Sequence, residues 1–280
     1  MSSSIAPGRL HVVSTPIGNL GDFSFRAIET LRGVALILAE DTRHSRTLLD
    51  RYEIRTPVAS YHEHNEAKMT PVLVERLVGG DDLALISDAG TPLLSDPGAR
   101  LVRAAIDAGV SVIAVPGASA LLSALVASGV SAERFTFYGF LPRKGRERSA
   151  TLAELGSLRH TAVLYEAPSR VAETLADLDA HGAGERFSVV AREMTKQYEE
   201  IRRGTVATLR AYYSNSPPRG EVVIVLAGAE ARQVDESEVR TRARELVAER
   251  RSARDVVAQL VAELGVPRNR AYEIVEEEKS

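Results

Sequence analysis

The chain has no cysteine and no tryptophan among its 280 residues. The absence of cysteine excludes disulfides, thiolate metal ligands and thiol nucleophiles together, and it is compatible with a reducing compartment. No stretch approaches the roughly 20 apolar residues that a membrane-spanning helix requires. The opening residues, MSSSIAPGRLHVV, also lack a basic segment followed by an apolar one. We therefore expect a cytoplasmic protein that has no membrane partner and no metal centre.

Neither sign of charge dominates the composition. The chain carries 35 basic and 38 acidic side chains, for a formal net charge of -3. This balance argues against wholesale coating of nucleic acid, although a local basic patch could still bind it. With 44% hydrophobic residues, the chain is expected to form one or two packed domains with a sizeable core.

Three familiar motifs are missing. No GxGxxG follows the first apolar run, where residues 13–19 read VSTPIGN, which argues against a dinucleotide-binding fold. Residues 139–145 do not end in Gly-Lys-Ser/Thr, so no Walker loop is present. Residues 117–121, GASAL, lack the closing glycine of a nucleophile elbow, and we expect Ser119 to cap a helix or line a site.

Apolar, β-rich runs alternate with helical patterns over most of the chain, which predicts an α/β fold with largely parallel strands. The predicted strands are 10–13, 34–39, 83–86, 110–115, 135–140, 162–165, 187–190 and 222–226. Helical spacing is found at 30–32, 99–108, 118–128 and 170–179. We assign an N-terminal α/β domain to residues 1–118, a second α/β domain to 119–230 and a helical tail to 235–280.

The tail resembles a helix-turn-helix. Residues 252–263 and 268–275 fit two short helices, and LGVP at 264–267 forms the turn between them. Either the tail contacts nucleic acid or its helices only pack together, and the sequence leaves both open because acidic and basic residues are mixed here. The basic residues that could meet phosphate are Arg250, Arg251, Arg254, Arg268 and Arg270.

The most informative segment is SDAGTPLLSDPG, residues 87–98. It follows a short apolar run and precedes a helix opened by Asp96-Pro97. A loop stiffened by glycine and proline at the carboxyl end of a buried strand is how open α/β sheets hold ligands. The sequence therefore predicts a small-molecule site here, and we call residues 87–98 the signature loop.

Three other polar clusters have two readings each. His62 and His64 could share a metal ion, but without a third ligand a solvated or substrate-facing loop is favoured. EDTR at 40–43 follows an apolar run. Asp41 either caps a helix or acts in the site, and Arg43 and Arg46, on one helical face, could bind phosphate. LPRKGRER at 141–148 is either a solvated loop or a phosphate contact.

Eight motifs follow one another in the order found in a known family. They are STPIGNLGD (14–22), AEDTR (39–43), YHEHNE (61–66), SDAGTPLLSDPG (87–98), VPGASA (115–120), GFLPRKG (139–145), YEAPSR (165–170) and AREMTKQYEE (191–200). Together they resemble the ribosomal RNA small subunit methyltransferase I family, which is similar in fold to the tetrapyrrole methylases. The resemblance covers about residues 9–228, and the helical tail is similar to that of many members.

The resemblance implies transfer of a methyl group from S-adenosylmethionine to the 2′-oxygen of a cytidine ribose in the decoding region of small-subunit ribosomal RNA. It also implies a homodimer, with the cofactor in the cleft between the two α/β halves; the acceptor is either free RNA or the assembled small subunit. Carried over by position, the cofactor-binding residues would be Ile17, Ser87, Asp88, Ala89, Gly90, Thr91, Pro92, Gly117, Ser119, Ala120, Glu166, Met194, Leu226 and Ala227, with Leu226 and Ala227 beside the adenine.

A sulfonium is an activated methyl donor, so the protein must mainly align the two reactants and exclude water. A ribose hydroxyl is a poor nucleophile, and a general base could assist it. The candidates are Asp41, Glu40 and Lys196, which the sequence does not rank. Each also has another possible role: Asp41 could cap a helix, Glu40 could pair with Arg43, and Lys196 could contact phosphate. For contacts to RNA phosphate we expect Arg43, Arg143, Lys144, Arg146 and Arg170.

Two alternatives remain. A corrin or porphyrin methyltransferase would share the fold and the cofactor, although the motifs at 39–43 and 61–66 and the tail fit the RNA enzyme better. A non-catalytic regulator would bind nucleic acid through the tail and a ligand through the α/β part. Methyl transfer by a tailless chain would count against the regulator.

Overall fold

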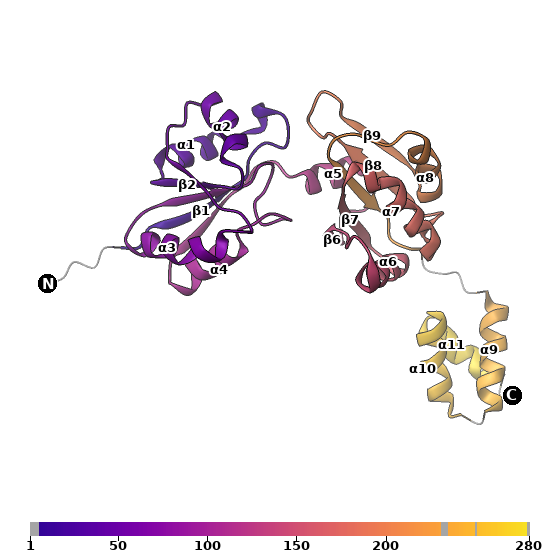
Figure 1. Cartoon of the computed structure of the whole chain (residues 1–280). Helices are drawn as coiled ribbons and strands as arrows, with labels where there is room; N and C mark the ends of the chain where they lie inside the picture. The colour runs from indigo at the N-terminus through magenta and orange to yellow at the C-terminus, as the bar shows by residue number, and fades with distance from the viewer. Residues whose placement is uncertain (1–5, 231–234, 250, 279–280) are drawn as a thin grey trace. The chain divides into compact units, whose positions relative to one another are not determined.

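A computed structural model describes residues 6–230, 235–249 and 251–278. The chain folds into two compact units, residues 1–228 and 229–280 (Figure 1). The larger unit contains two five-stranded sheets, and the described part of the smaller unit is helical. Arg250 lies outside the described residues.

The first sheet is parallel throughout and has the strand order β3-β2-β4-β1-β5. Its strands are β1 (Arg9–Val13), β2 (Leu36–Ala39), β3 (Val58–Ser60), β4 (Leu83–Ile86) and β5 (Ser111–Val115). The helices of this half are α1 (Phe25–Gly33), α2 (Thr42–Arg51), α3 (Glu66–Val78) and α4 (Ala99–Asp107). Every residue of β2 and β4 is buried, which explains their continuous apolar runs.

Helices cover both faces of the first sheet. On one face α1 and α2 pack against alternate strand residues such as Ile37 and Ile86. On the other face α3 and α4 pack against Leu38 and Leu85 (Figure 1). The loops at the carboxyl edge of this sheet are left to form a site.

The second sheet is mixed, with the order β6-β7-β10-β8-β9. Its strands are β6 (Phe135–Phe140), β7 (Thr161–Glu166), β8 (Phe187–Arg192), β9 (Glu200–Thr205) and β10 (Val222–Leu226). Only the pair β6–β7 is parallel, and the other three pairs are antiparallel. The prediction of largely parallel strands is therefore wrong for this half. Burial of β10 on both faces gives it the apolar run of a parallel strand, which says nothing about its direction.

The second sheet is also covered on both faces. Its helices are α5 (Ala120–Ser128), α6 (Gly145–Ser157), α7 (Val171–Leu178) and α8 (Val206–Asn215). Helix α5 packs on one face, and α6, α7 and α8 pack on the other. The predicted strands of this half are all found, whereas the polar strand β9 and the helices α6 and α8 were not predicted.

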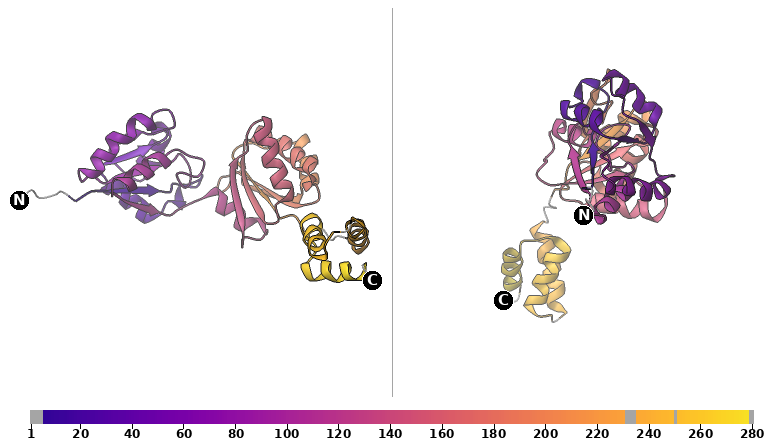
Figure 2. Two further views of the ribbon diagram at one scale, coloured as in Figure 1. Left: turned by 90° about the horizontal axis from the view of Figure 1, so that it is seen from below. Right: turned by 90° about the vertical axis from the view of Figure 1, so that its left-hand side faces the viewer.

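The smaller unit has three described helices, α9 (Glu236–Ala248), α10 (Ala253–Leu264) and α11 (Arg268–Glu277), seen at the yellow end of the chain in Figure 2. Leu246, Leu260 and Ile274 meet in its core. The two helices predicted here are confirmed, with α10 and α11 joined by a short turn. No helix among the described residues is long and apolar enough to cross a membrane.

Ion pairs occupy part of the basic set in this unit. Arg251 pairs with Glu249 at 2.8 Å. Arg270 pairs with Glu236 at 2.7 Å and with Glu273 at 2.6 Å. Arg254 and Arg268 are exposed. Both are therefore accessible to phosphate.

The core of the second sheet provides a test of stability. Leu164 of β7 has no exposed surface. We expect Leu164→Ala to lower the free energy of unfolding by about 2–5 kcal/mol, because the buried methyl groups are lost and a cavity remains. Urea unfolding followed by circular dichroism measures the change. As a control, Ile106→Ala on α4, where the side chain is 54% exposed, should stay within about 0.5 kcal/mol of the original chain.

Candidate functional site

The signature loop is fastened to the first strand of the chain. The backbone amide of Thr15 donates to the carbonyl of Gly90 at 2.8 Å, and the amide of Gly90 donates to the carbonyl of Thr15 at 3.1 Å. The Thr15 hydroxyl also donates to the carbonyl of Ser87 at 3.2 Å. Ser14 and Thr91 share a further hydrogen bond of 3.0 Å between their hydroxyls. The loop is thus held by buried hydrogen bonds at the carboxyl edge of the sheet.

Part of the signature loop is in the left-handed backbone region. Leu93 and Ser95 have φ of 75° and 73°, which is unfavourable for residues with a side chain. At Gly98, with φ of 126°, a Cβ atom would lie 2.4 Å from Cδ2 of Leu85, so no other residue fits without displacement. Such strain is typical of ligand sites, where surrounding structure fixes an unfavourable backbone.

A cavity of about 390 Å³ opens beside this loop, and we call it the apolar cavity. Its size is in the range of small-molecule sites. Both halves of the larger unit line it, with residues Ile17, Ala89, Gly90, Thr91, Leu94, Ser95 and Asp96 from the first and Ala120, Phe140, Tyr165, Glu166, Ala167, Pro168, Gly220, Glu221, Val222 and Val223 from the second.

A second cavity of about 310 Å³, the polar cavity, adjoins the first. The two share Ile17, Ala89 and Glu221 as lining residues. The remaining residues of the polar cavity are Pro16, Gly18, Leu20, His44, Ser45, Thr47, Leu48, Ser87, Asp88 and Lys196. Two cavities with a common wall can hold two molecules whose reacting atoms meet, which is what a group transfer requires.

Lys196 lies where the two halves approach each other. A Cβ atom at Gly18 would stand 2.3 Å from Cγ of Lys196, so only glycine allows this contact. Next to it, the amide of Asn19 donates to the Thr195 hydroxyl at 3.1 Å. The Lys196 ammonium pairs with Glu193 at 3.0 Å and with Glu221 at 3.1 Å. Burial lowers the pKa of Lys196, but these two hydrogen bonds outweigh it and raise the pKa, so the ammonium remains charged.

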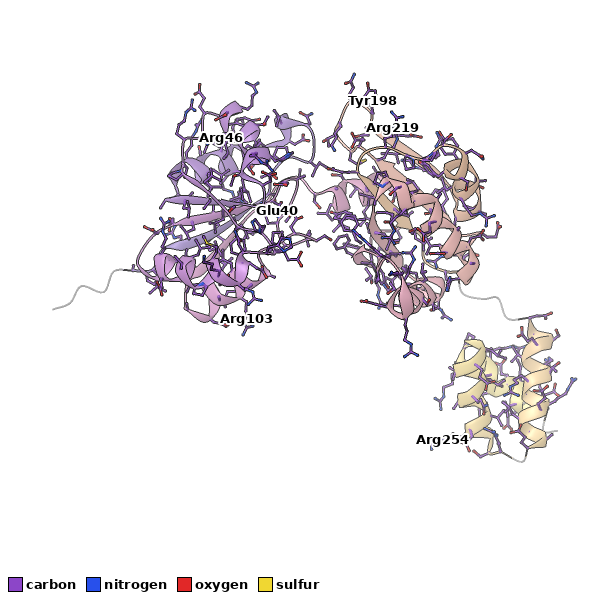
Figure 3. All side chains as sticks on the ribbon, viewed as in Figure 1. Glu40, Arg46, Arg103, Tyr198, Arg219 and Arg254 are labelled. Carbon is purple, nitrogen blue, oxygen red and sulfur yellow. The ribbon has the colours of Figure 1, made fainter. Side chains whose placement is uncertain are left out.

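Acidic side chains gather at the carboxyl ends of β2 and β4. Glu40 is labelled in Figure 3 on this side of the first half. Burial, and then the charge of Asp88, raises the pKa of Glu40. Burial, and then the charge of Glu40, raises the pKa of Asp96 to about 6. Mutual repulsion in a partly buried setting thus favours proton uptake here.

Asp41 has a structural role at the start of α2. Its carboxylate accepts a hydrogen bond of 2.8 Å from the backbone amide of Arg43 and pairs with the Arg43 guanidinium at 3.3 Å. The side-chain hydrogen bond from Arg43 contributes most to lowering the pKa of Asp41. Of its two readings, this arrangement is that of a helix cap.

The structure brings together many of the residues expected to bind the cofactor. The expected residues that line one of the two cavities are Ile17, Ser87, Asp88, Ala89, Gly90, Thr91, Ala120 and Glu166. Outside both linings are Pro92, Gly117, Ser119 and Met194. Ser119 caps α5 by accepting a hydrogen bond from the amide of Leu122.

Leu226 and Ala227 lie at the other end of the second sheet. Leu226 pairs with Ala162 at the start of β7, whereas Val222 pairs with Glu166 at its end. Because β10 runs antiparallel to β7, its amino end faces the apolar cavity. Neither Leu226 nor Ala227 lines either cavity, and residues 220–223 of this strand and its approach line the apolar cavity.

Glu166 lines the apolar cavity, and both of its carboxylate oxygens accept hydrogen bonds from neighbouring residues. One carboxylate oxygen accepts from the Thr174 hydroxyl at 2.5 Å, and the other accepts from the backbone amide of Ala167 at 2.9 Å. Arg170 approaches the same carboxylate at 3.7 Å and also donates to the carbonyl of Pro142. Arg170, expected to meet RNA, is thus a largely buried residue that joins two loops beside the cavity.

The other candidate RNA contacts are on the surface. Arg143, Lys144 and Arg146 are exposed around the start of α6. The Arg43 side chain is 91% exposed despite its pairing with Asp41. Arg46, on the same helix, is labelled at the surface in Figure 3. These side chains can reach a bound polyanion.

Two aromatic residues of the site were not predicted from the sequence. Phe140 and Tyr165 contact each other edge to face, with ring centroids 5.7 Å apart, on the wall of the apolar cavity. Both lie within recognised motifs, but their aromatic character gave no separate signal. His62 and His64 also stand edge to face, at 5.9 Å. Among the described residues, no group of three histidine, cysteine or acidic side chains is close enough to hold a metal ion.

A family model that matches this chain and the curated proteins similar to it both describe methyltransferases. The family model for Tetrapyrrole (Corrin/Porphyrin) Methylases matches residues 9–210. "Ribosomal RNA small subunit methyltransferase I" of Synechocystis sp. is 45% identical over 270 residues, covering 95% of this chain and 97% of that protein. The protein of the same name from Bacillus subtilis is 40% identical, covering 95% of this chain and 93% of its own length.

Solved structures resemble the chain in fold. Uroporphyrin-III C-methyl transferase from Thermus thermophilus, complexed with S-adenyl homocysteine, has a TM-score of 0.57 and 16% identity, covering 79% of this chain and 97% of that one. Diphthine synthase has a TM-score of 0.60 and 15% identity, covering 78% and 89%. At these identities the likeness establishes the fold alone.

The raised pKa of Asp96 predicts a pH-dependent stability. The folded chain holds this proton more tightly than the unfolded chain, whose carboxyl titrates near 3.8. The contribution of Asp96 is therefore complete below about pH 3.8 and is lost as the pH rises through about 6. We expect Asp96→Asn to raise the free energy of unfolding at pH 7.5 and to leave it nearly unchanged at pH 4, as measured by urea unfolding. Asp22→Asn, at an exposed position, serves as the control; an equal effect of Asp96→Asn at both pH values would contradict the prediction.

Proposed function

The chain belongs to the tetrapyrrole (corrin/porphyrin) methylase family, among the proteins of the ribosomal RNA small subunit methyltransferase I type, and we propose that it methylates small-subunit ribosomal RNA. The proposed reaction transfers the methyl group of S-adenosylmethionine to the 2′-oxygen of a cytidine ribose in the decoding region. The observation that carries the proposal is identity of 40–45% with such proteins over 95% of this chain.

The two adjoining cavities suit this reaction. We assign the cofactor to the apolar cavity, where Phe140 and Tyr165 offer aromatic surface and Asp96 offers a carboxylate that can accept hydrogen bonds from hydroxyl or ammonium groups. When bound, S-adenosylmethionine supplies an activated methyl group. The fixed loop backbone around Gly90 orients that molecule, and the common wall at Ile17 and Ala89 sets the direction toward the polar cavity.

Glu40 is the best of the three candidates for accepting the proton of the ribose hydroxyl. Its raised pKa brings it closer to the operating pH, where a general base is most effective. Asp41 is occupied as the cap of α2, and its lowered pKa makes it a weaker base. Lys196 carries a positive charge and has no free electron pair, so it would attract the anionic RNA backbone into the polar cavity instead.

The RNA would be held by exposed cations around the two cavities. Arg43, Arg143, Lys144 and Arg146 are available for phosphate, and such contacts supply much of the affinity for RNA. Arg170 would act indirectly, by fixing the loop at Pro142 next to those residues.

A homodimer is part of the proposal. Leu122 and Val126 lie one helical turn apart on α5 and are 50% and 75% exposed. Phe140, which lines the apolar cavity, is 56% exposed. Burying such apolar surface favours association with a second copy of the chain.

The function is tested by incubating the purified protein with radiolabelled S-adenosylmethionine and small ribosomal subunits from cells that lack this methylation. Alkali-resistant label at a decoding-region cytidine supports the proposal, because 2′-O-methylation blocks alkaline cleavage at that nucleotide. Bound cofactor without label on subunits or on free RNA would contradict it, and corrin and porphyrin acceptors would then be tried. A chain that binds no cofactor would point to the non-catalytic regulator.

The role of Glu40 is tested by Glu40→Gln. Loss of a general base costs about 10²–10⁴-fold in kcat, and we expect a decrease in this range together with loss of the acidic limb of the pH profile. The dissociation constant for S-adenosylmethionine should not change, because Glu40 does not line the apolar cavity, whereas its neighbour Asp88 lines the polar cavity. Glu29→Gln, at an exposed position on α1, is the matched control. A Glu40→Gln enzyme with normal kcat would exclude Glu40 as the base.

A further inference from the structure

A third pocket, of about 260 Å³, lies on the α8 side of the second sheet and has no role in the proposed chemistry. We call it the tyrosine pocket. It combines basic, aromatic and proline side chains from β8, β9, α8 and the segment that leads into β10. Its lining residues are Arg192, Glu200, Tyr212, Tyr213, Ser216, Pro217, Pro218 and Arg219.

Positive charge exceeds negative charge around the tyrosine pocket. One carboxylate, Glu200, serves two guanidinium groups, that of Arg192 at 2.8 Å and that of Arg202 at 2.7 Å. Arg219 is exposed and has no ion pair among the residues that the structure describes. An anion entering the pocket thus meets unneutralised cationic groups.

The aromatic part of the pocket is preorganised for stacking. The Arg202 guanidinium lies 3.6 Å from the centre of the Tyr212 ring and donates a hydrogen bond to the Tyr212 hydroxyl at 3.0 Å. Tyr213 stands edge on to Tyr212, with ring centroids 5.0 Å apart. Tyr212 is 39% exposed, so part of its surface is available to a flat ligand. Base–aromatic stacking with an adjacent arginine is a common mode of binding single-stranded RNA.

One polar atom in this pocket has no partner. Tyr213 is 1% exposed, and its buried hydroxyl makes no hydrogen bond within the described part of the chain. Burial raises the pKa of Tyr213 to about 12, so the hydroxyl keeps its proton and remains a donor. Buried polar groups are nearly always paired, so this donor is available to an acceptor group that enters the pocket.

The tyrosine pocket is directly continuous in sequence with the lining of the apolar cavity at Arg219, and its Arg192 precedes a residue that binds Lys196 of the polar cavity. Arg219 precedes Gly220 and Glu221, which line the apolar cavity. Arg192 precedes Glu193, whose carboxylate accepts hydrogen bonds from Lys196 and from the amide of Glu221. Figure 3 labels Arg219 and Tyr198 at this end of the second half. A strand of RNA with its target ribose in the polar cavity can therefore continue into the tyrosine pocket.

We propose that the tyrosine pocket binds a nucleotide that flanks the target in the substrate RNA, an inference that rests on the proposed function. Arg219 and Arg192 hold its phosphate, and Tyr212 with the two prolines holds its base. A nucleotide unites a flat ring with an anion, and the pocket presents a partner for each. An acidic peptide would use the cations but leave the aromatic surface without a partner.

The test compares Arg219→Glu and Tyr212→Leu with the control Arg103→Glu, whose arginine is exposed on α4 (Figure 3). Methyl transfer to small subunits is measured across a salt series. For Arg219→Glu we expect KM for subunits to rise about tenfold, and the slope of log affinity against log salt to shrink by about 0.7, the value of one single-strand phosphate contact. For Tyr212→Leu we expect a rise of about tenfold in KM from lost stacking, with the salt slope retained.

In both variants kcat, the dissociation constant for S-adenosylmethionine and the melting temperature should match those of the Arg103→Glu control. If the original chain is active but Arg219→Glu and Arg103→Glu have the same KM for subunits, the inference is overturned and the proposed function is left intact. A fall in kcat with unchanged subunit binding would also overturn it. If the original chain neither binds nor methylates small subunits, the proposed function fails, and this inference fails with it.

Discussion

The site depends on the attachment of the signature loop to the first strand. The paired backbone hydrogen bonds between Thr15 and Gly90, together with the Thr15 hydroxyl, fix a loop whose own backbone is unfavourable at Leu93 and Ser95. Without these bonds the left-handed residues would relax, and the wall shared by the two cavities would lose its shape. A parallel sheet makes this possible, because it brings the loops after β1 and β4 to one edge. The proposed alignment of donor and acceptor therefore rests on hydrogen bonds that touch neither of them.

The local environment gives the charged side chains near the site different pKa values, which the sequence could not rank. Burial, and then repulsion from neighbouring carboxylates, raises the pKa of Glu40 and of Asp96. Asp41 stands beside them but is held by Arg43, which has the opposite effect on its pKa. Adjacent carboxylates thus differ in basicity because one caps a helix and the others do not.

Much of the fold could be predicted because burial leaves a pattern in the sequence. Continuous apolar runs at β2, β4 and β10 identified strands buried on both faces. Edge strand β9 was missed because its sequence, EIRRGT, is largely polar. Strand direction leaves no such pattern, and this is why residues 220–223 of the cavity wall were missed while Leu226 was chosen in their place. Most of the cofactor-binding residues expected in the first half line one of the two cavities, because the loops of this half follow parallel strands to one edge, although Pro92 and Gly117 line neither. The tyrosine pocket could not be predicted from the sequence, because residues from four separate segments form it.

The contact between Gly18 and Lys196 ties together two positions far apart in the chain. Any side chain at position 18 would occupy the space that the Lys196 stem now fills. The two positions are therefore sterically coupled, and a larger residue at position 18 fits only if the side chain at position 196 is shorter or moves. Since the same lysine also binds Glu193 and Glu221, such an exchange would alter the charge of the polar cavity as well as its shape. The polar cavity can accordingly be reshaped from a position that lies 178 residues away along the chain from the lysine that lines it.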